Sequence, residues 1–180
     1  DIVVATEDGQ MIVYAVPGYL GLIDLFDAAF PLPNGTIPIQ GVPTSLVIKG
    51  NFAIVSFYDS TSISIINYKT RMQIDEVNVG GQPKSIHVSP DGDYVVIVVT
   101  TEDPPSAYLS VIRSSNETAT NWKRRRYVIS ELEEDTVWEP APESIDINQN
   151  NLCAISMKNS IDRSIDLGAP ELKELEKAFL

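Results

Sequence analysis

The chain has 180 residues, 43% of them hydrophobic and 21% charged, which is ordinary for a globular protein and argues against disorder throughout. Its formal net charge of −12 argues against nucleic-acid binding and adsorption to anionic membranes, since both need a concentrated basic field. The apolar stretches are far shorter than the roughly 20 residues of a membrane-spanning helix, so no transmembrane segment is predicted. No signal peptide is visible, and the strand-like run Ile2–Ala5 suggests that the chain begins inside a domain.

The first 40 residues predict an incomplete unit of β-structure. Short apolar runs predict strands at Ile2–Thr6, Met11–Val16 and Leu20–Phe26, with a turn at Glu7–Gly9. Proline, asparagine and glycine at Pro31–Thr36 predict a loop, which leaves this unit short of a fourth strand.

A sequence repeat then organises the chain. Three segments read Pro, any residue, Ser, aliphatic, any residue, aliphatic: Pro43–Ile48, Pro83–Val88 and Pro142–Ile147. Each is followed by a turn and an apolar strand, at Asn51–Phe57, Asp93–Val99 and Asn151–Met157. The copies start 40 and 59 residues apart, a spacing expected of propeller blades with four short strands.

The unit from Pro43 to Gly81 is the best formed, with further strands predicted at Ile63–Ile66 and Met72–Val79. With its Val-Gly-x-x-Pro step at Val79–Pro83, it resembles the YVTN-type β-propeller repeat. That resemblance implies an all-β fold of four-stranded antiparallel blades, in a partial or small propeller. We therefore expect about four blades' worth of sequence in residues 1–167, the first blade incomplete.

The acidic segment Trp138–Ile147 carries a second resemblance. It is similar to the Glu-Pro-Glu segment of large secreted propellers in the choice-of-anchor and mesenchyme-specific cell-surface glycoprotein group, although Ala141 and Pro142 are additional here. The resemblance implies an extracellular or cell-surface protein.

Between the second and third repeats, strands are predicted at Ala107–Arg113 and Arg124–Ile129, with loops at Ser114–Asn121 and Glu131–Asp135. The basic cluster Lys123–Arg126 is read first as a charged, solvated strand edge. A processing site and a patch that binds an acidic neighbour are the alternatives.

The periodicity changes at the C-terminus. Leu172, Leu175 and Phe179 share one face of a helix expected within residues 168–180, and Pro170 suits its first turn. At about three turns this amphipathic helix is marginal alone, so it must dock. Its own or a following domain is favoured over a separate partner.

Two Asn-x-Thr sequons, at Asn34 and Asn116, lie in predicted polar loops. Such loops are accessible to oligosaccharyl transferase, so glycosylation of at least one is predicted.

Residues that could carry chemistry are few. Glu139, Glu143 and Asp146 could supply oxygen ligands to Ca²⁺, with a solvated acidic loop as the alternative. A Ser-His-Asp site would need the single histidine, His87, yet that residue is placed mid-strand and no Gly-x-Ser-x-Gly elbow exists. The single cysteine, Cys153, is interpreted as a buried small hydrophobe.

Two functions remain open. The first is a secreted or cell-surface propeller glycoprotein acting as a structural and interaction module. Its partner would be another protein or matrix component, the rest of its own propeller or another copy. The second is a calcium-dependent propeller hydrolase, phytase-like or lactonase-like. The repeats, the sequons, the acidity and the lack of catalytic motifs favour the first.

Overall fold

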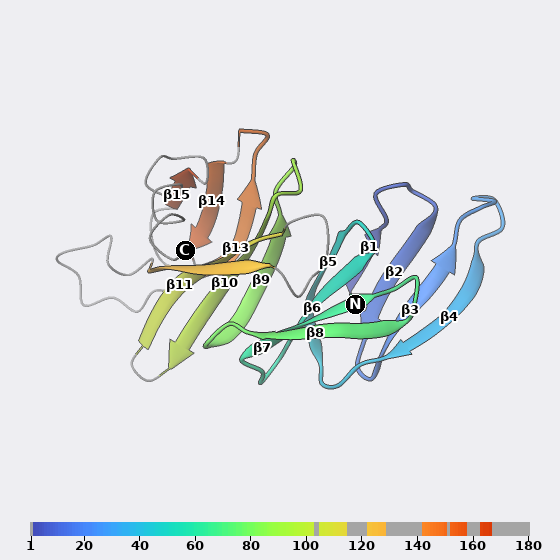
Figure 1. Ribbon diagram of the computed structural model, residues 1–180, viewed down its shortest axis with the longest axis horizontal. Coiled ribbons are helices and arrows are strands. Elements are labelled where there is room, and N and C mark those ends of the chain that lie inside the picture. The colour runs from blue at the N-terminus through green and yellow to red at the C-terminus, as the bar shows by residue number, and fades with distance from the viewer. Residues whose placement is uncertain are drawn as a thin grey trace.

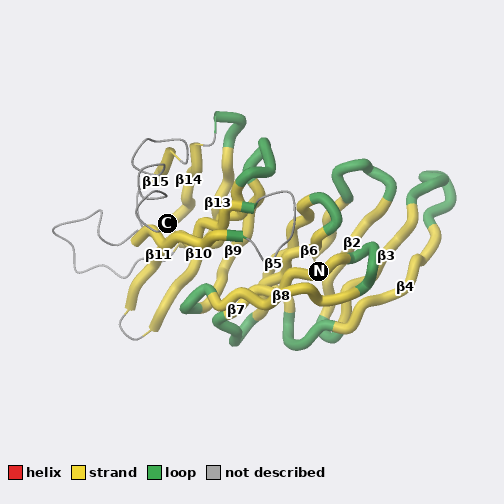
Figure 2. Tube along the Cα trace, in the orientation of Figure 1, coloured by secondary structure: helices red, strands yellow, loops and turns green. Residues whose placement is uncertain are grey.

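The computed structural model describes residues 2–102, 105–114, 122–128, 142–150, 152–157 and 163–166. These residues form strands and turns. This part of the chain contains no helix that could span a membrane. Their strands make four antiparallel sheets in chain order, which Figure 1 shows side by side. Turns join successive strands at the ends of the sheets (Figure 2).

Each sheet is a run of consecutive strands. Sheet 1 contains β1 (Ile2–Ala5), β2 (Met11–Val16), β3 (Tyr19–Asp24) and β4 (Leu32–Pro38). Sheet 2 contains β5 (Pro43–Lys49), β6 (Phe52–Phe57), β7 (Ser62–Asn67) and β8 (Met72–Asn78). Sheet 3 contains β9 (Gln82–Val88), β10 (Tyr94–Glu102), β11 (Pro105–Arg113) and β12 (Lys123–Val128). Sheet 4 contains β13 (Pro142–Ile147), β14 (Leu152–Met157) and β15 (Arg163–Asp166).

The first strands of neighbouring sheets contact one another, in the order β1, β5, β9 and β13. They are therefore the inner strands, and β4, β8 and β12 are the outermost strands of their sheets. The prediction of an all-β fold built from four-stranded antiparallel units is confirmed.

The core lies between the sheets because alternate side chains of each strand point to opposite neighbours. Between sheets 1 and 2, Leu20 packs in one cluster with Val55. Between sheets 2 and 3, Ile54 packs with Ile97, and between sheets 3 and 4, Val98 packs with Ile155. Strand β10 has neighbours on both faces, which explains its unbroken apolar run at Val95–Val99, where every residue is fully buried.

In sheets 1, 3 and 4, the hairpin after the inner strand is closed by a side-chain acceptor. The backbone N–H of Tyr94 donates to Ser89 Oγ at 2.9 Å, and that of Met11 donates to Thr6 Oγ1 at 3.1 Å. In sheet 4, the N–H of Leu152 donates to Asn148 Oδ1 at 3.0 Å. Sheet 1 therefore begins with a further copy of the repeated hairpin, although it lacks the Pro-x-Ser sequence.

The prediction of a loop at Pro31–Thr36 is wrong, because strand β4 occupies most of that segment. The outermost strand tolerates Pro33, since its free edge needs no N–H donor. A register shift between Gly21 and Ile23 marks a bulge opposite, where Gly35 adopts φ +83°. Sheet 1 consequently has four strands, and the expectation of an incomplete first unit is wrong as well.

Two boundaries also differ from the sequence prediction. Strand β3 ends at Asp24 rather than Phe26, because the Asp24 carboxylate accepts the backbone N–H of Phe26 at 2.7 Å and turns the chain. Strands β10 and β11 pair as far as Glu102 with Pro105, beyond the predicted strand end at Val99. The expected helix within residues 168–180 and the loops at 115–121 and 131–135 lie outside the described residues.

Candidate functional site

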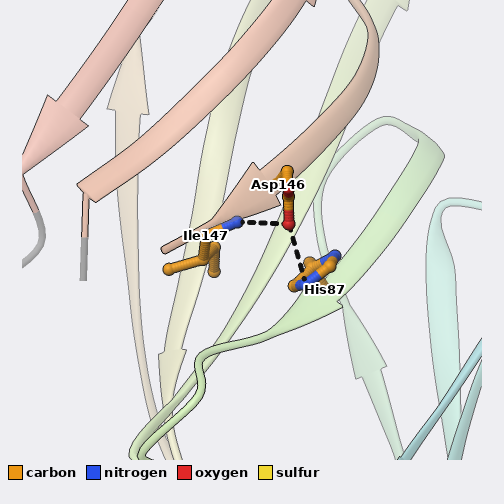
Figure 3. Close-up of polar contacts among 3 residues, drawn as sticks. All are labelled: His87, Asp146 and Ile147. Atoms are coloured by element: carbon orange, nitrogen blue, oxygen red, sulfur yellow. Dashed lines mark hydrogen bonds and ion pairs between the residues drawn. The ribbon is translucent and has the colours of Figure 1, made fainter. Parts of the chain in front are cut away.

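Among the described side chains, two titratable groups on inner strands meet. His87 on β9 and Asp146 on β13 approach to 3.4 Å between Nε2 and Oδ1 (Figure 3). The same carboxylate oxygen accepts the backbone N–H of Ile147 at 2.8 Å. The His87 side chain is 38% exposed and that of Asp146 is 83% exposed, so the pair lies at a solvent-accessible surface.

The repeat explains why these two residues meet. His87 and Asp146 occupy the same position of the Pro-x-Ser repeat in sheets 3 and 4, and β9 contacts β13 directly. The corresponding residue of sheet 2, Val47, is apolar and packs between sheets 2 and 3. Sequence reasoning identified these positions as equivalent and missed their contact, because a repeat does not show which equivalent residues face each other.

The chemistry of this pair is limited. A catalytic triad would also need a nucleophile on the histidine, and no hydroxyl in the described part of the chain is hydrogen-bonded to His87. An exposed pair of this kind contributes little to stability, so we interpret it as a weak link between sheets 3 and 4.

The three carboxylates predicted for Ca²⁺ are not brought together in the described structure. Glu139 lies outside the described residues, and for Glu143 the structure describes only its place in β13. Asp146 faces His87. Among the described residues, no group of three or more His, Cys, Asp and Glu side chains could hold a metal ion, and the calcium hypothesis stays a prediction.

Cys153 lies on β14 and is completely buried between sheets 3 and 4. Burial, with a smaller contribution from Asp146, raises the pKa of its thiol to about 12. The thiol is therefore protonated at neutral pH, which confirms its interpretation as a small buried hydrophobe.

The sequon asparagine Asn34 lies on strand β4 rather than in the predicted loop. Arg71, in the turn between β7 and β8, donates from Nη2 to the backbone oxygen of Asn34 at 2.9 Å and to Oδ1 at 3.1 Å. The side chain of Asn34 is half-buried, and Thr36 of the same sequon is exposed. Sheets 1 and 2 are thus linked at their outer strands through this residue. Asn116 lies outside the described residues.

The loop between β3 and β4, together with the first residue of β4, forms an apolar surface that sequence reasoning missed. Phe26 is 93% exposed, Phe30 is 73% exposed and Leu32 is 65% exposed. We call residues 25–32 the aromatic loop. The sequence carried a signal at Phe30, which lies outside every predicted strand, whereas Phe26 was placed at the end of a predicted strand.

Hydrogen bonds order the aromatic loop from Leu25 to Phe30. The N–H of Leu25 donates to the Gln10 carbonyl oxygen at 2.8 Å, next to the bond between Asp24 and Phe26. Asp27 accepts the N–H of Ala29 at its carboxylate and that of Phe30 at its carbonyl, at 3.0 and 2.9 Å. The exposed phenylalanines are therefore displayed on a folded turn.

The basic cluster Lys123–Arg126 forms most of β12, the outermost strand of sheet 3. Lys123, Arg124 and Arg126 are exposed, as the interpretation of a charged strand edge predicted. The guanidinium carbon of Arg126 lies 3.5 Å from the centroid of the Tyr108 ring. This strand is thus a cationic surface on the outer rim.

Comparisons with known proteins show the fold. No protein-family model matches the chain, and no curated protein sequence matches it significantly. Among solved structures, a hydrazine synthase chain from Kuenenia stuttgartiensis is similar at 18% identity and a TM-score of 0.68, over 92% of this chain and 45% of the other. A chain of the mitotic checkpoint complex is similar at 12% identity and a TM-score of 0.66, over 90% of this chain and 47% of the other.

The β-propeller domain of Cps50 (Swd1) from Myceliophthora thermophila is similar at 13% identity and a TM-score of 0.66, over 89% of this chain and 54% of that domain's chain. The four sheets are therefore consecutive blades of a β-propeller. The chain spans about half the length of these propeller-containing structures.

Proposed function

We propose that this protein is a secreted or cell-surface β-propeller that acts as a structural and protein-interaction module. The observation that carries the proposal is the aromatic loop. Phe26 is exposed over 93% of its surface, so its ring buries almost no apolar area against its own sheet. Exposed aromatic residues that protrude from a surface are typical anchors of protein–protein contacts.

The propeller fold supports this proposal. Propellers place loops on a rigid disc, and loops on a rigid scaffold are where binding residues concentrate. One similar structure is a chain of a multiprotein assembly, the mitotic checkpoint complex. The resemblance of Trp138–Ile147 to secreted propellers supports the extracellular location, with a protein or matrix component as the partner.

The aromatic loop is tested by a double substitution, Phe26→Ser with Phe30→Ser. Fluorescently labelled protein is added to the cells that produce it and to their matrix, and the bound fraction is measured. We expect the double variant to bind at least about tenfold more weakly, since exposed aromatic anchors contribute most of such binding energy. Met72→Ser, which replaces a side chain 61% exposed on β8, is the matched control and should bind normally. Equal binding by the double variant and the unsubstituted protein would refute the proposal.

We also propose that the protein is N-glycosylated at one or both of Asn34 and Asn116. Thr36 is exposed on the outer strand of sheet 1, where the sequon is at the rim rather than between sheets. The Arg71 contact uses the carbonyl and amide oxygens of Asn34. The amide nitrogen, which would carry the glycan, makes no hydrogen bond to any residue in the described part of the chain.

Intact-mass measurement on protein purified from its native source tests this proposal. Treatment with peptide N-glycosidase F should lower the mass. In the Asn34→Gln variant, this decrease should be smaller by the mass of the glycan at Asn34. Thr36→Ala is the matched control, because it destroys the sequon and keeps the Asn34–Arg71 contact. Asn116→Gln separates the second site. A native mass equal to that of the bare polypeptide would refute glycosylation.

A further inference from the structure

Charge is distributed unevenly between the sheets. Residues 1–48, which form sheet 1 and most of β5, contain five Asp and Glu residues and no Lys, Arg or His. The first basic residue, Lys49, is buried and its ammonium group donates to the carbonyl of Gly92. The aromatic loop therefore lies on a sheet whose own charges are all negative, and Asp24 and Asp27 lie beside its phenylalanines.

A partner for this loop must match both its aromatic rings and its carboxylates. Arginine and lysine do so, because a guanidinium stacks on aromatic faces and also pairs with carboxylates. Within the described residues, the cationic strand β12 is such a surface, because Lys123, Arg124 and Arg126 are exposed there. Arg126 already stacks on Tyr108 within the chain, at 3.5 Å.

The two surfaces cannot meet within one molecule. Sheet 2 lies between sheet 1, which carries the loop, and sheet 3, which carries β12 (Figure 1). Both surfaces are on outer parts of their sheets, since the loop leads into outermost strand β4 and β12 is itself outermost. Each is therefore available to another molecule.

We propose that the aromatic loop binds the cationic strand β12 of a second copy of this chain. The inference rests on the proposed function, because it names the partner of the same loop. Two copies each carry a net charge of −12 and repel at long range. At about 0.15 M salt this repulsion is screened beyond roughly 8 Å, while groups in direct contact still attract. The local match between loop and strand then decides association.

Sedimentation velocity of the purified full chain over a concentration series measures the association. We expect concentration-dependent dimers or larger species. Phe26→Ser with Phe30→Ser should weaken the association at least about tenfold, as should Lys123→Ser with Arg124→Ser. Asp24→Asn with Asp27→Asn removes two charges and keeps both turn acceptors. Any weakening of the association in this variant therefore measures the electrostatic contribution to it. Met72→Ser should associate normally.

A mixing experiment tests the pairing itself. The Phe26→Ser, Phe30→Ser variant retains β12, and the Lys123→Ser, Arg124→Ser variant retains the loop. Each variant alone should be monomeric, and an equimolar mixture should form a 1:1 complex through the one intact contact. A monomeric unsubstituted protein, or association that all these substitutions leave unchanged, would overturn the inference. If the protein is monomeric and the loop variant nevertheless loses cell-surface binding, only the second-copy inference fails; if that binding is also unaffected, the proposed function fails too.

Discussion

Replacing Tyr108 with alanine is expected to lower the free energy of unfolding by about 3–5 kcal/mol, the usual cost of deleting a large buried aromatic side chain. Tyr108 on β11 is fully buried between sheets 2 and 3. Its hydroxyl donates to the carbonyl oxygen of Val79 at 2.7 Å, at the point where the chain passes from one sheet to the next. One side chain therefore fills the core and also fixes the connection between two blades.

A second variant separates these two roles. Tyr108→Phe keeps the ring and leaves the Val79 carbonyl without its donor, so we expect a loss of about 1–3 kcal/mol. Guanidinium titration followed by circular dichroism measures both variants. If Tyr108→Phe and Tyr108→Ala lowered the free energy of unfolding equally, the packing role of the ring would be wrong. If Tyr108→Phe left the free energy of unfolding unchanged, the buried hydrogen bond would contribute nothing to stability.

Gly81→Ala is expected to destabilise the protein by about 1–3 kcal/mol, the range for forcing extra volume into a packed region. A Cβ at Gly81 would lie 2.6 Å from the backbone oxygen of Thr100 and 2.9 Å from Val99 Cγ1. The backbone oxygen belongs to β10 and can move only if the strand moves. The second glycine of the Val-Gly-x-x-Pro step is therefore required by close approach of the chain to β10.

The matched control for this prediction is Gly21→Ala. A Cβ there would overlap the outer end of the half-buried Tyr14 ring at 2.0–2.3 Å, and a side chain can rotate away. We expect Gly21→Ala to cost less than Gly81→Ala in the same titration. The reverse order would show that the backbone contact at Thr100 is easily relieved.

The fold could be predicted because the repeat records a physical requirement that each sheet shares. The Pro-x-Ser segments mark inner strands, and the continuous apolar run at Val95–Val99 reports burial on both faces. The first hairpin was not recognised as a copy because its inner strand, Ile2–Ala5, lacks the Pro-x-Ser sequence that marks the other three copies. Strand β4 was missed because an edge position and a bulge make Pro33 and Gly35 acceptable, and neither is visible in local propensity.

The candidate site could be predicted less well. The cationic strand was found, because four consecutive basic residues are recognisable in any context. The contact between His87 and Asp146 depends on the packing of β9 against β13, which the sequence does not specify. The exposure of Phe26 follows from the end of β3 at Asp24, and prediction of strand ends is uncertain by a few residues.

The link between Asn34 and Arg71 has a consequence for the order of events during synthesis. A chain emerges from its N-terminus, and Arg71 follows Asn34 by 37 residues. Until the turn between β7 and β8 has emerged, no guanidinium can engage the asparagine, and its amide is open to a modifying enzyme. The second blade thus sets the length of time during which the asparagine side chain can still rotate towards a modifying enzyme, and a substitution at Arg71 would extend that interval without altering the sequon.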